Sequence, residues 1–101
     1  MARNIKVSAQ AQRQIHEADS WWRTNREKAP GAIREELERV GELLAARPHL
    51  GARATNVSLA GVRKIHLERI HYDIYYRVVG TPEQIEIVAF WSSHRGSGPS
   101  I

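Results

Sequence analysis

The chain has 101 residues, a formal net charge of +4 and no cysteine. This length allows one domain with one compact core. The absence of cysteine excludes a disulfide scaffold and any cysteine-ligated zinc or iron–sulfur site, and a composition of 42% hydrophobic and 26% charged residues excludes a disordered chain. The basic balance predicts an anionic partner, either a nucleic acid or an acidic protein.

The sequence shows no signal for membrane insertion or export. No segment approaches the run of about 18 apolar residues that a membrane span requires, and the N-terminus lacks the apolar stretch of a signal peptide. We therefore expect a cytoplasmic protein with no membrane partner. One domain is expected over residues 1–95, followed by a flexible C-terminal tail over residues 96–101, which are rich in Gly, Ser and Pro.

A short strand at residues 2–7 is predicted to lead into two helices. Ser8 provides an N-cap for the first helix, which runs to about Arg26 and is ended by the Ala-Pro-Gly segment at 29–31. The second helix is predicted over residues 31–46. The apolar stripes consist of Ala11, Ile15, Ala18 and Trp22 in the first helix and of Ile33, Leu37, Val40 and Leu44 in the second. Matched stripes and a short connection predict an antiparallel helical hairpin.

From residue 57 onward, apolar residues recur at every second position, which is typical of strands. Three strands are predicted near residues 63–67, 72–78 and 85–91, and their short connections make neighbours antiparallel. In the last strand this alternation places Ile85, Ile87, Ala89 and Trp91 on one face, and Glu86, Val88 and Phe90 on the other. Because both faces are apolar, we expect this strand to be central or covered on both sides. The prediction is an α+β domain of order β-α-α-β-β-β, with an N-terminal strand, an α-helical hairpin on one face of the sheet and a three-stranded antiparallel meander.

Several short motifs occur in a fixed order between these elements. They are Trp21-Trp22-Arg23, Arg47-Pro48-His49-Leu50-Gly51, Gly61-Val62-Arg63-Lys64-Ile65, Tyr72-Asp73-Ile74-Tyr75-Tyr76-Arg77-Val78, Ile85-Glu86-Ile87-Val88 and Ser93-His94-Arg95. In this order and spacing, over residues 3–95, the chain resembles the RelE/ParE superfamily of toxins from bacterial type II toxin–antitoxin operons. The resemblance implies a RelE/ParE-like fold, no cofactor and a hetero-oligomeric complex with a cognate acidic antitoxin.

The superfamily contains two activities. RelE-like members are ribosome-dependent endoribonucleases that cut mRNA, whereas ParE-like members inhibit DNA gyrase and are not known as nucleases. RelE-like nucleases use a basic cluster on the sheet, and the matching positions here are Lys64, His66 and Arg95. However, the position of their middle-strand arginine is Asp73, which would repel a phosphate, and their C-terminal tyrosine has no counterpart in residues 96–101.

These two departures favour the ParE branch. The predicted function is growth inhibition by binding DNA gyrase, with no firm catalytic residue and with neutralisation by the antitoxin. One alternative is a RelE-like ribosome-dependent mRNA endonuclease that uses Lys64, His66 and Arg95 on the ribosome. The other is an inactive toxin homologue that acts only as antitoxin partner and co-repressor. The basic residues are dispersed among acidic ones, so an acidic antitoxin explains the positive excess better than a nucleic acid does.

The expected antitoxin- or target-binding residues lie near the end of the first helix and along the strands. They are Trp21, Arg23, Arg26, Lys64, His66, Asp73, Tyr75, Phe90, His94 and Arg95. Structural roles are expected for Arg63, Trp22 and Tyr76, which share their faces with apolar residues. Histidines titrate near neutral pH and suit acid–base roles. No metal site is expected, since His66, His71 and His94 lack a carboxylate partner at a recognisable spacing.

Overall fold

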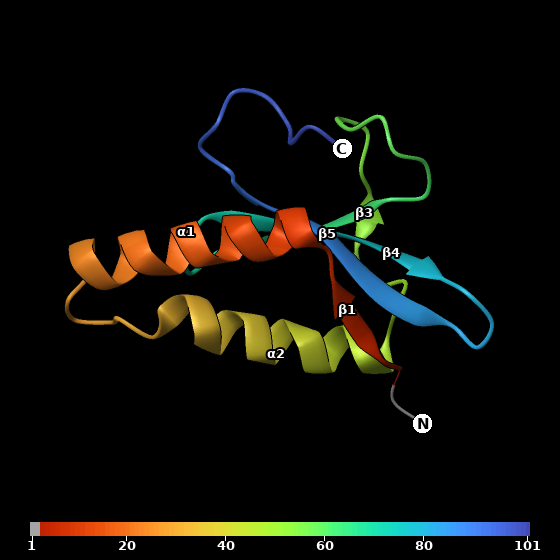
Figure 1. Ribbon diagram of the computed structural model, residues 1–101, viewed down its shortest axis with the longest axis horizontal. Coiled ribbons are helices and arrows are strands. Elements are labelled where there is room, and N and C mark those ends of the chain that lie inside the picture. Colours follow the sequence, from red (N-terminus) through yellow and green to blue (C-terminus); the bar gives the residue numbers. More distant parts are fainter. Residues whose placement is uncertain (1–2) are drawn as a thin grey trace.

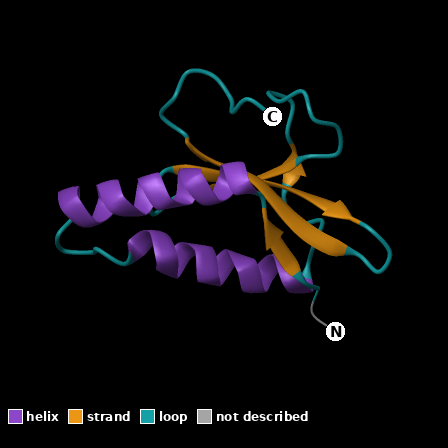
Figure 2. Cartoon of the chain, in the orientation of Figure 1, coloured by secondary structure: helices purple, strands orange, loops and turns teal. Residues whose placement is uncertain are grey.

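The computed structural model describes residues 3–101, in which two helices lie side by side next to a five-stranded sheet (Figures 1 and 2). The elements are β1 (Ile5–Val7), α1 (Ala9–Asn25), α2 (Ala32–Ala46), β2 (Ala52–Arg53), β3 (Arg63–Leu67), β4 (Tyr72–Val79) and β5 (Gln84–Ser92). The predicted α+β class, the helical hairpin and the meander of the last three strands are confirmed. The predicted first strand began at Ala2, which lies outside the described residues. No helix in the described part of the chain is long and apolar enough to cross a membrane.

The two helices form where their apolar stripes predict them. The Ser8 side chain caps α1 by accepting a hydrogen bond from the Ala11 N–H at 3.1 Å, and α1 ends before Pro30. The stripes of both helices pack against the sheet in the main core, where Ala11, Ala18, Ile33, Val40 and Leu44 are buried. Burial of these apolar stripes is what holds the hairpin on one face of the sheet.

The strand order in the sheet is β1-β5-β4-β3-β2. Strands β3, β4 and β5 are antiparallel neighbours, as predicted, whereas β1 pairs parallel with β5. The prediction that the last strand is central is therefore confirmed, because β5 lies between β1 and β4. Strand β2 is an additional edge strand that the sequence did not predict, since its two residues are too few to show an alternation.

A β-bulge at Val88 reverses the alternation in β5. Tyr75 of β4 lies opposite Ala89, but the next residue, Tyr76, lies opposite Ile87, which leaves Val88 as the extra residue. Phe90 consequently faces the helices in the main core, while Ala89 and Trp91 face the other side with Val88. The predicted faces of β5 are correct up to Ile87 and wrong after the bulge.

The face of the sheet opposite the helices is covered by two irregular segments. Val57 and Leu59, from the loop before β3, and Ile101 pack against a second buried cluster on this face. The Ile101 carbonyl accepts hydrogen bonds from two N–H groups of that loop, at 3.1 and 3.2 Å. Segment 96–101, for which the sequence predicts a flexible tail, thus folds back onto the sheet, and Pro99 is buried within it.

A hydrogen bond from the Gly51 N–H to the Tyr76 hydroxyl oxygen, 2.8 Å long, ties the loop after α2 to the sheet. Arg63 donates to the Gly51 carbonyl at 2.7 Å, and a Cβ atom on Gly51 would lie 2.9 Å from the Tyr76 ring. The loop therefore approaches the sheet so closely that only glycine fits. Burial raises the pKa of Tyr76, which keeps its hydroxyl neutral at physiological pH.

Tyr76→Phe is expected to lower the free energy of unfolding by about 1–3 kcal/mol, because it leaves the buried Gly51 N–H without a partner. Urea denaturation measures this change. Tyr72→Phe is the matched control: within residues 3–101 the Tyr72 hydroxyl makes no hydrogen bond, so its removal should cost less than about 0.5 kcal/mol. Equal losses in the two variants would contradict the role of this hydrogen bond.

Candidate partner-binding surface

The predicted contact residues lie in three environments. Trp21, Arg23 and Arg26 are exposed at the C-terminal end of α1. A second group lies on the sheet face opposite the helices or just after β5: Lys64, His66, Asp73, Tyr75, His94 and Arg95. Phe90 alone lies in the main core, where it is 1% exposed, and this burial removes it from the binding surface.

The end of α1 presents an aromatic and cationic patch. Trp21 is 48% exposed and meets Trp22 edge-on, with ring centroids 6.1 Å apart. The Arg26 guanidinium lies 5.0 Å from the centre of the Trp21 ring, within the range of a cation–π interaction. Trp22 packs against the core and donates its indole N–H to the Ala29 carbonyl at 3.0 Å. This contact holds Trp22 in place, so that Trp21 is the residue that faces outward.

A cleft of about 560 Å³ separates this patch from the β3–β4 turn and the end of β5. We name it the Trp21 cleft. Its lining residues are Trp21, Trp22, Arg26, Arg69, Ile70, His71, Tyr72, Ser92 and His94. It brings together three of the predicted contact residues, Trp21, Arg26 and His94. It adds Arg69 and His71, which are not among the predicted contact residues because only the folded turn carries them toward α1.

Two acidic residues of α2 hold Arg69 at the edge of this cleft. Its guanidinium lies 2.9 Å from the Glu35 carboxylate and 3.8 Å from the Glu36 carboxylate. The Glu36 side chain is buried and accepts a hydrogen bond of 2.9 Å from Arg39. That hydrogen bond lowers the pKa of Glu36 despite its burial, and the positive charges of Arg39 and Arg69 lower it further.

Glu36→Gln is expected to lower the free energy of unfolding by about 1 kcal/mol at neutral pH, a modest value because its partner Arg39 is largely exposed to solvent. A carboxyl group whose pKa is lowered by folding stabilises the protein above its unfolded pKa and loses that contribution as pH falls through the folded pKa. The difference between wild type and variant should therefore shrink below pH 4.5. Urea denaturation at a series of pH values measures it, and the exposed Glu38→Gln is the control. A difference that persists unchanged in acid would contradict the ion pair's role.

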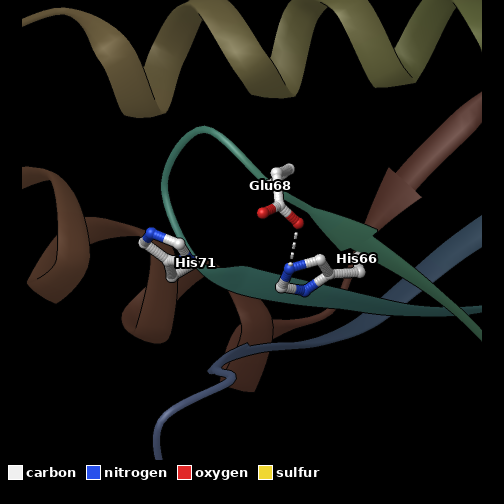
Figure 3. Close-up of side chains that lie close together, drawn as sticks. All are labelled: His66, Glu68 and His71. Carbon is white, nitrogen blue, oxygen red and sulfur yellow. Dashed lines mark ion pairs between the residues drawn. The ribbon is translucent and has the colours of Figure 1, made fainter.

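Histidines and carboxylates meet where β3 turns into β4 (Figure 3). His66 Nδ1 lies 2.8 Å from Asp73 Oδ1, and His66 Nε2 lies 3.1 Å from Glu68 Oε2. The expectation that these histidines lack a carboxylate partner is therefore wrong for His66. The pairing register places Asp73 directly opposite His66 on the neighbouring strand, a relation that spacing along the sequence does not reveal.

Of the three candidate nuclease residues, only Lys64 and His66 are placed on one face of the sheet, and the three do not form a cationic site. Lys64 and His66 are two residues apart on β3 and so point to the same side. The Arg95 guanidinium instead lies 4.0 Å from the centre of the Trp91 ring. Asp73, which is 8% exposed, lies on β4 between the two neighbouring strands. It is opposite His66 on β3 and opposite Trp91 on β5, so a carboxylate separates these positions. Tyr75 is 1% exposed, and its hydroxyl accepts a hydrogen bond from Asn56 at 2.9 Å. Like Phe90, this predicted contact residue is therefore removed from the binding surface by its burial.

A second cleft, of about 580 Å³, runs between the two helices and β1. We name it the β1 groove. Half of its lining is aliphatic, contributed by Ile5, Val7, Ile15, Ile33, Leu37 and Ile87. The sequence did not single out these residues as a binding site, because their helical and strand periodicity assigns them to the core. Ile5 is nevertheless exposed at the surface, and the groove lies beside an edge strand of the sheet.

Comparison with known proteins assigns the family. The profile of the family described as ParE toxin of type II toxin-antitoxin system, parDE, matches residues 5–96. A solved structure of the chromosomal ParDE toxin–antitoxin system from P. aeruginosa shares the fold, with a TM-score of 0.71 and 24% identity over 90% of this chain and 96% of that chain. A mutant E. coli toxin RelE, in complex with a peptide of antitoxin RelBc, matches with a TM-score of 0.53 and 16% identity over 94% of this chain and 87% of that chain. No curated protein shows significant sequence similarity. The chain belongs to the ParE toxin family, within the RelE/ParE superfamily, and is a toxin of a type II toxin–antitoxin module.

Proposed function

We propose that this toxin inhibits DNA gyrase by protein–protein contact and that a cognate acidic antitoxin neutralises it. The environment of His66 favours gyrase over mRNA as the target. The two ring nitrogens of His66 face the carboxylates of Asp73 and Glu68. A nuclease of the RelE type requires cations here to stabilise charge on the phosphate. Two carboxylates at this position oppose binding of an RNA phosphate.

The Trp21 cleft is the surface that we assign to gyrase. A half-exposed tryptophan covered by an arginine has the composition of an interface hot spot, since Trp and Arg are the residues most enriched there. The cleft offers a concave site beside Trp21 in which a protruding side chain of the target is shielded from water.

The β1 groove is the surface that we assign to the antitoxin. An amphipathic helix buries its apolar face in such a groove, and an extended segment adds to the free edge of β1. Within residues 3–101, β1 pairs only with β5, so its other edge is available for an added strand. The net charge of +4 attracts an acidic partner and raises its association rate.

Inducible expression separates the three candidate functions. The proposed function predicts SOS induction and gyrase–DNA cleavage complexes, both abolished by co-expression of a small acidic protein encoded next to the toxin. Rapid arrest of translation with codon-phased mRNA cuts would instead identify an endonuclease. Absence of toxicity would identify a homologue that acts only as antitoxin partner and co-repressor.

The second candidate is the endonuclease. Lys64 and His66 lie on one face of β3, and His66 pairs with Asp73 across the sheet in an arrangement suited to proton transfer. His66→Ala and Arg95→Ala decide between the two. Toxicity that survives both changes excludes the nuclease mechanism, whereas its loss in both variants, with folding retained, contradicts gyrase inhibition through the Trp21 cleft.

A further inference from the structure

The side chains of His66, Glu68 and His71 lie close together at the turn between β3 and β4 (Figure 3), and one potential ligand atom from each lies within 4.8 Å of the others. The separation of 3.1 Å between His66 Nε2 and Glu68 Oε2 is close to the distance between neighbouring ligands in a tetrahedral zinc site, about 3.3–3.5 Å for zinc–ligand bonds of about 2.0–2.2 Å. We propose that these three residues form a binding site for a divalent transition metal ion, with Zn²⁺ as the preferred ion. The proposal does not depend on the action of the toxin on gyrase.

The orientation of His66 supports this site. Its Nδ1 lies 2.8 Å from the carboxylate of Asp73, which is itself buried. A carboxylate on one ring nitrogen fixes the tautomer and directs the lone pair of the other nitrogen toward a metal, an arrangement that accompanies most metal-bound histidines. Here the other nitrogen, Nε2, is the one that faces Glu68. The buried Asp73 therefore prepares an exposed imidazole for coordination.

The backbone holds His71 in place on the opposite side of the turn. Its φ of 57° lies in the left-handed region, which is uncommon for a residue other than glycine. Its N–H donates to the Leu67 carbonyl at 2.8 Å, and its carbonyl accepts hydrogen bonds from Ser93 N–H and Oγ at 2.9 and 2.8 Å. These hydrogen bonds fix the backbone of His71, whose ring centroid lies 6.4 Å from that of His66. Such constrained conformations concentrate at functional sites.

The ligand chemistry selects the metal. Two imidazoles and one carboxylate suit Zn²⁺ and its neighbours, whereas Ca²⁺ and Mg²⁺ prefer all-oxygen sites. Three protein ligands leave a fourth position open to water, as in zinc sites that exchange ligands. The His94 ring lies 5.0 Å from that of His71. The site is exposed, so a bound ion is accessible to a ligand from a partner.

Titration calorimetry of the untagged 101-residue chain with ZnCl₂ tests the proposal. We expect one Zn²⁺ to bind per chain. His66→Gln and His71→Gln should each weaken binding at least about tenfold, and Asp73→Asn by about 10–100-fold because it removes the partner that orients His66. His16→Gln and His49→Gln are the matched controls, since both histidines are exposed and lie outside the cluster; each should bind Zn²⁺ within about twofold of wild type.

A second measurement reports on the ligands directly. Co²⁺ bound in place of Zn²⁺ should give visible absorption bands that are lost in the His66→Gln/His71→Gln double variant. The proposal is overturned if the double variant binds Zn²⁺ as tightly as wild type, or if the control variants lose affinity to the same extent. Thermal unfolding without metal verifies folding in each case. The two histidine variants decide the question even if the buried Asp73→Asn change prevents folding.

Discussion

Replacing Trp21 with alanine is expected to raise the toxin concentration that half-inhibits gyrase by about 30-fold, which corresponds to the loss of about 2 kcal/mol of binding free energy. The side chain is 48% exposed at the edge of the Trp21 cleft, beneath the Arg26 guanidinium. Alanine removes the large apolar surface and also the ring that holds Arg26 in position. A gyrase supercoiling assay with purified toxin measures the change.

The fold should tolerate this substitution. Trp21 contacts Trp22 only edge-on, so its removal is expected to cost less than about 1 kcal/mol of unfolding free energy. Leu50→Ala is the matched control, because Leu50 is 49% exposed and lies outside the cleft. If both variants inhibit gyrase as strongly as wild type, the Trp21 cleft is not the surface that contacts gyrase.

The parts of the fold that depend on local periodicity were predictable. The stripes that include Ala11 and Ile33 repeat at helical spacing within one helix, and the Ser8 cap acts over three residues. The alternation in β3 and β4 likewise required only neighbours along the chain. Each of these signals lies within a short window of sequence, and each predicted element is present in the structure.

Features that depend on pairing between strands were not predictable in the same way. The bulge at Val88 is defined by the register between β4 and β5. A prediction from the sequence alone therefore extends the regular alternation through Phe90. The carboxylate partner of His66 is Asp73, which lies on another strand, and the two residues meet only through the β3–β4 register. The Trp21 cleft likewise requires the turn that carries His71 to approach the end of α1.

Phe90→Ala is expected to lower the free energy of unfolding by about 3–5 kcal/mol, a large part of the 5–15 kcal/mol that stabilises a typical domain. The ring is 1% exposed and stacks on Tyr72, with centroids 4.6 Å apart and an interplanar angle of 7°. Its removal leaves a cavity between β5 and the helices that surrounding side chains fill only in part. Urea denaturation measures the loss, and a fall in Tm should accompany it.

Trp91→Ala tests the bulge itself, because the two possible registers predict opposite orders of stability. With Val88 as the extra residue, Phe90 faces the helices and Trp91 faces the other side, where it is half-buried and donates to the Ser97 carbonyl at 2.7 Å. Its loss should then cost about 1–2 kcal/mol, clearly less than the loss of Phe90. Unbroken alternation would instead place Trp91 in the core and Phe90 outside it. A larger loss for Trp91→Ala than for Phe90→Ala would therefore contradict the bulge, and it would return Phe90 to the set of residues available to a partner.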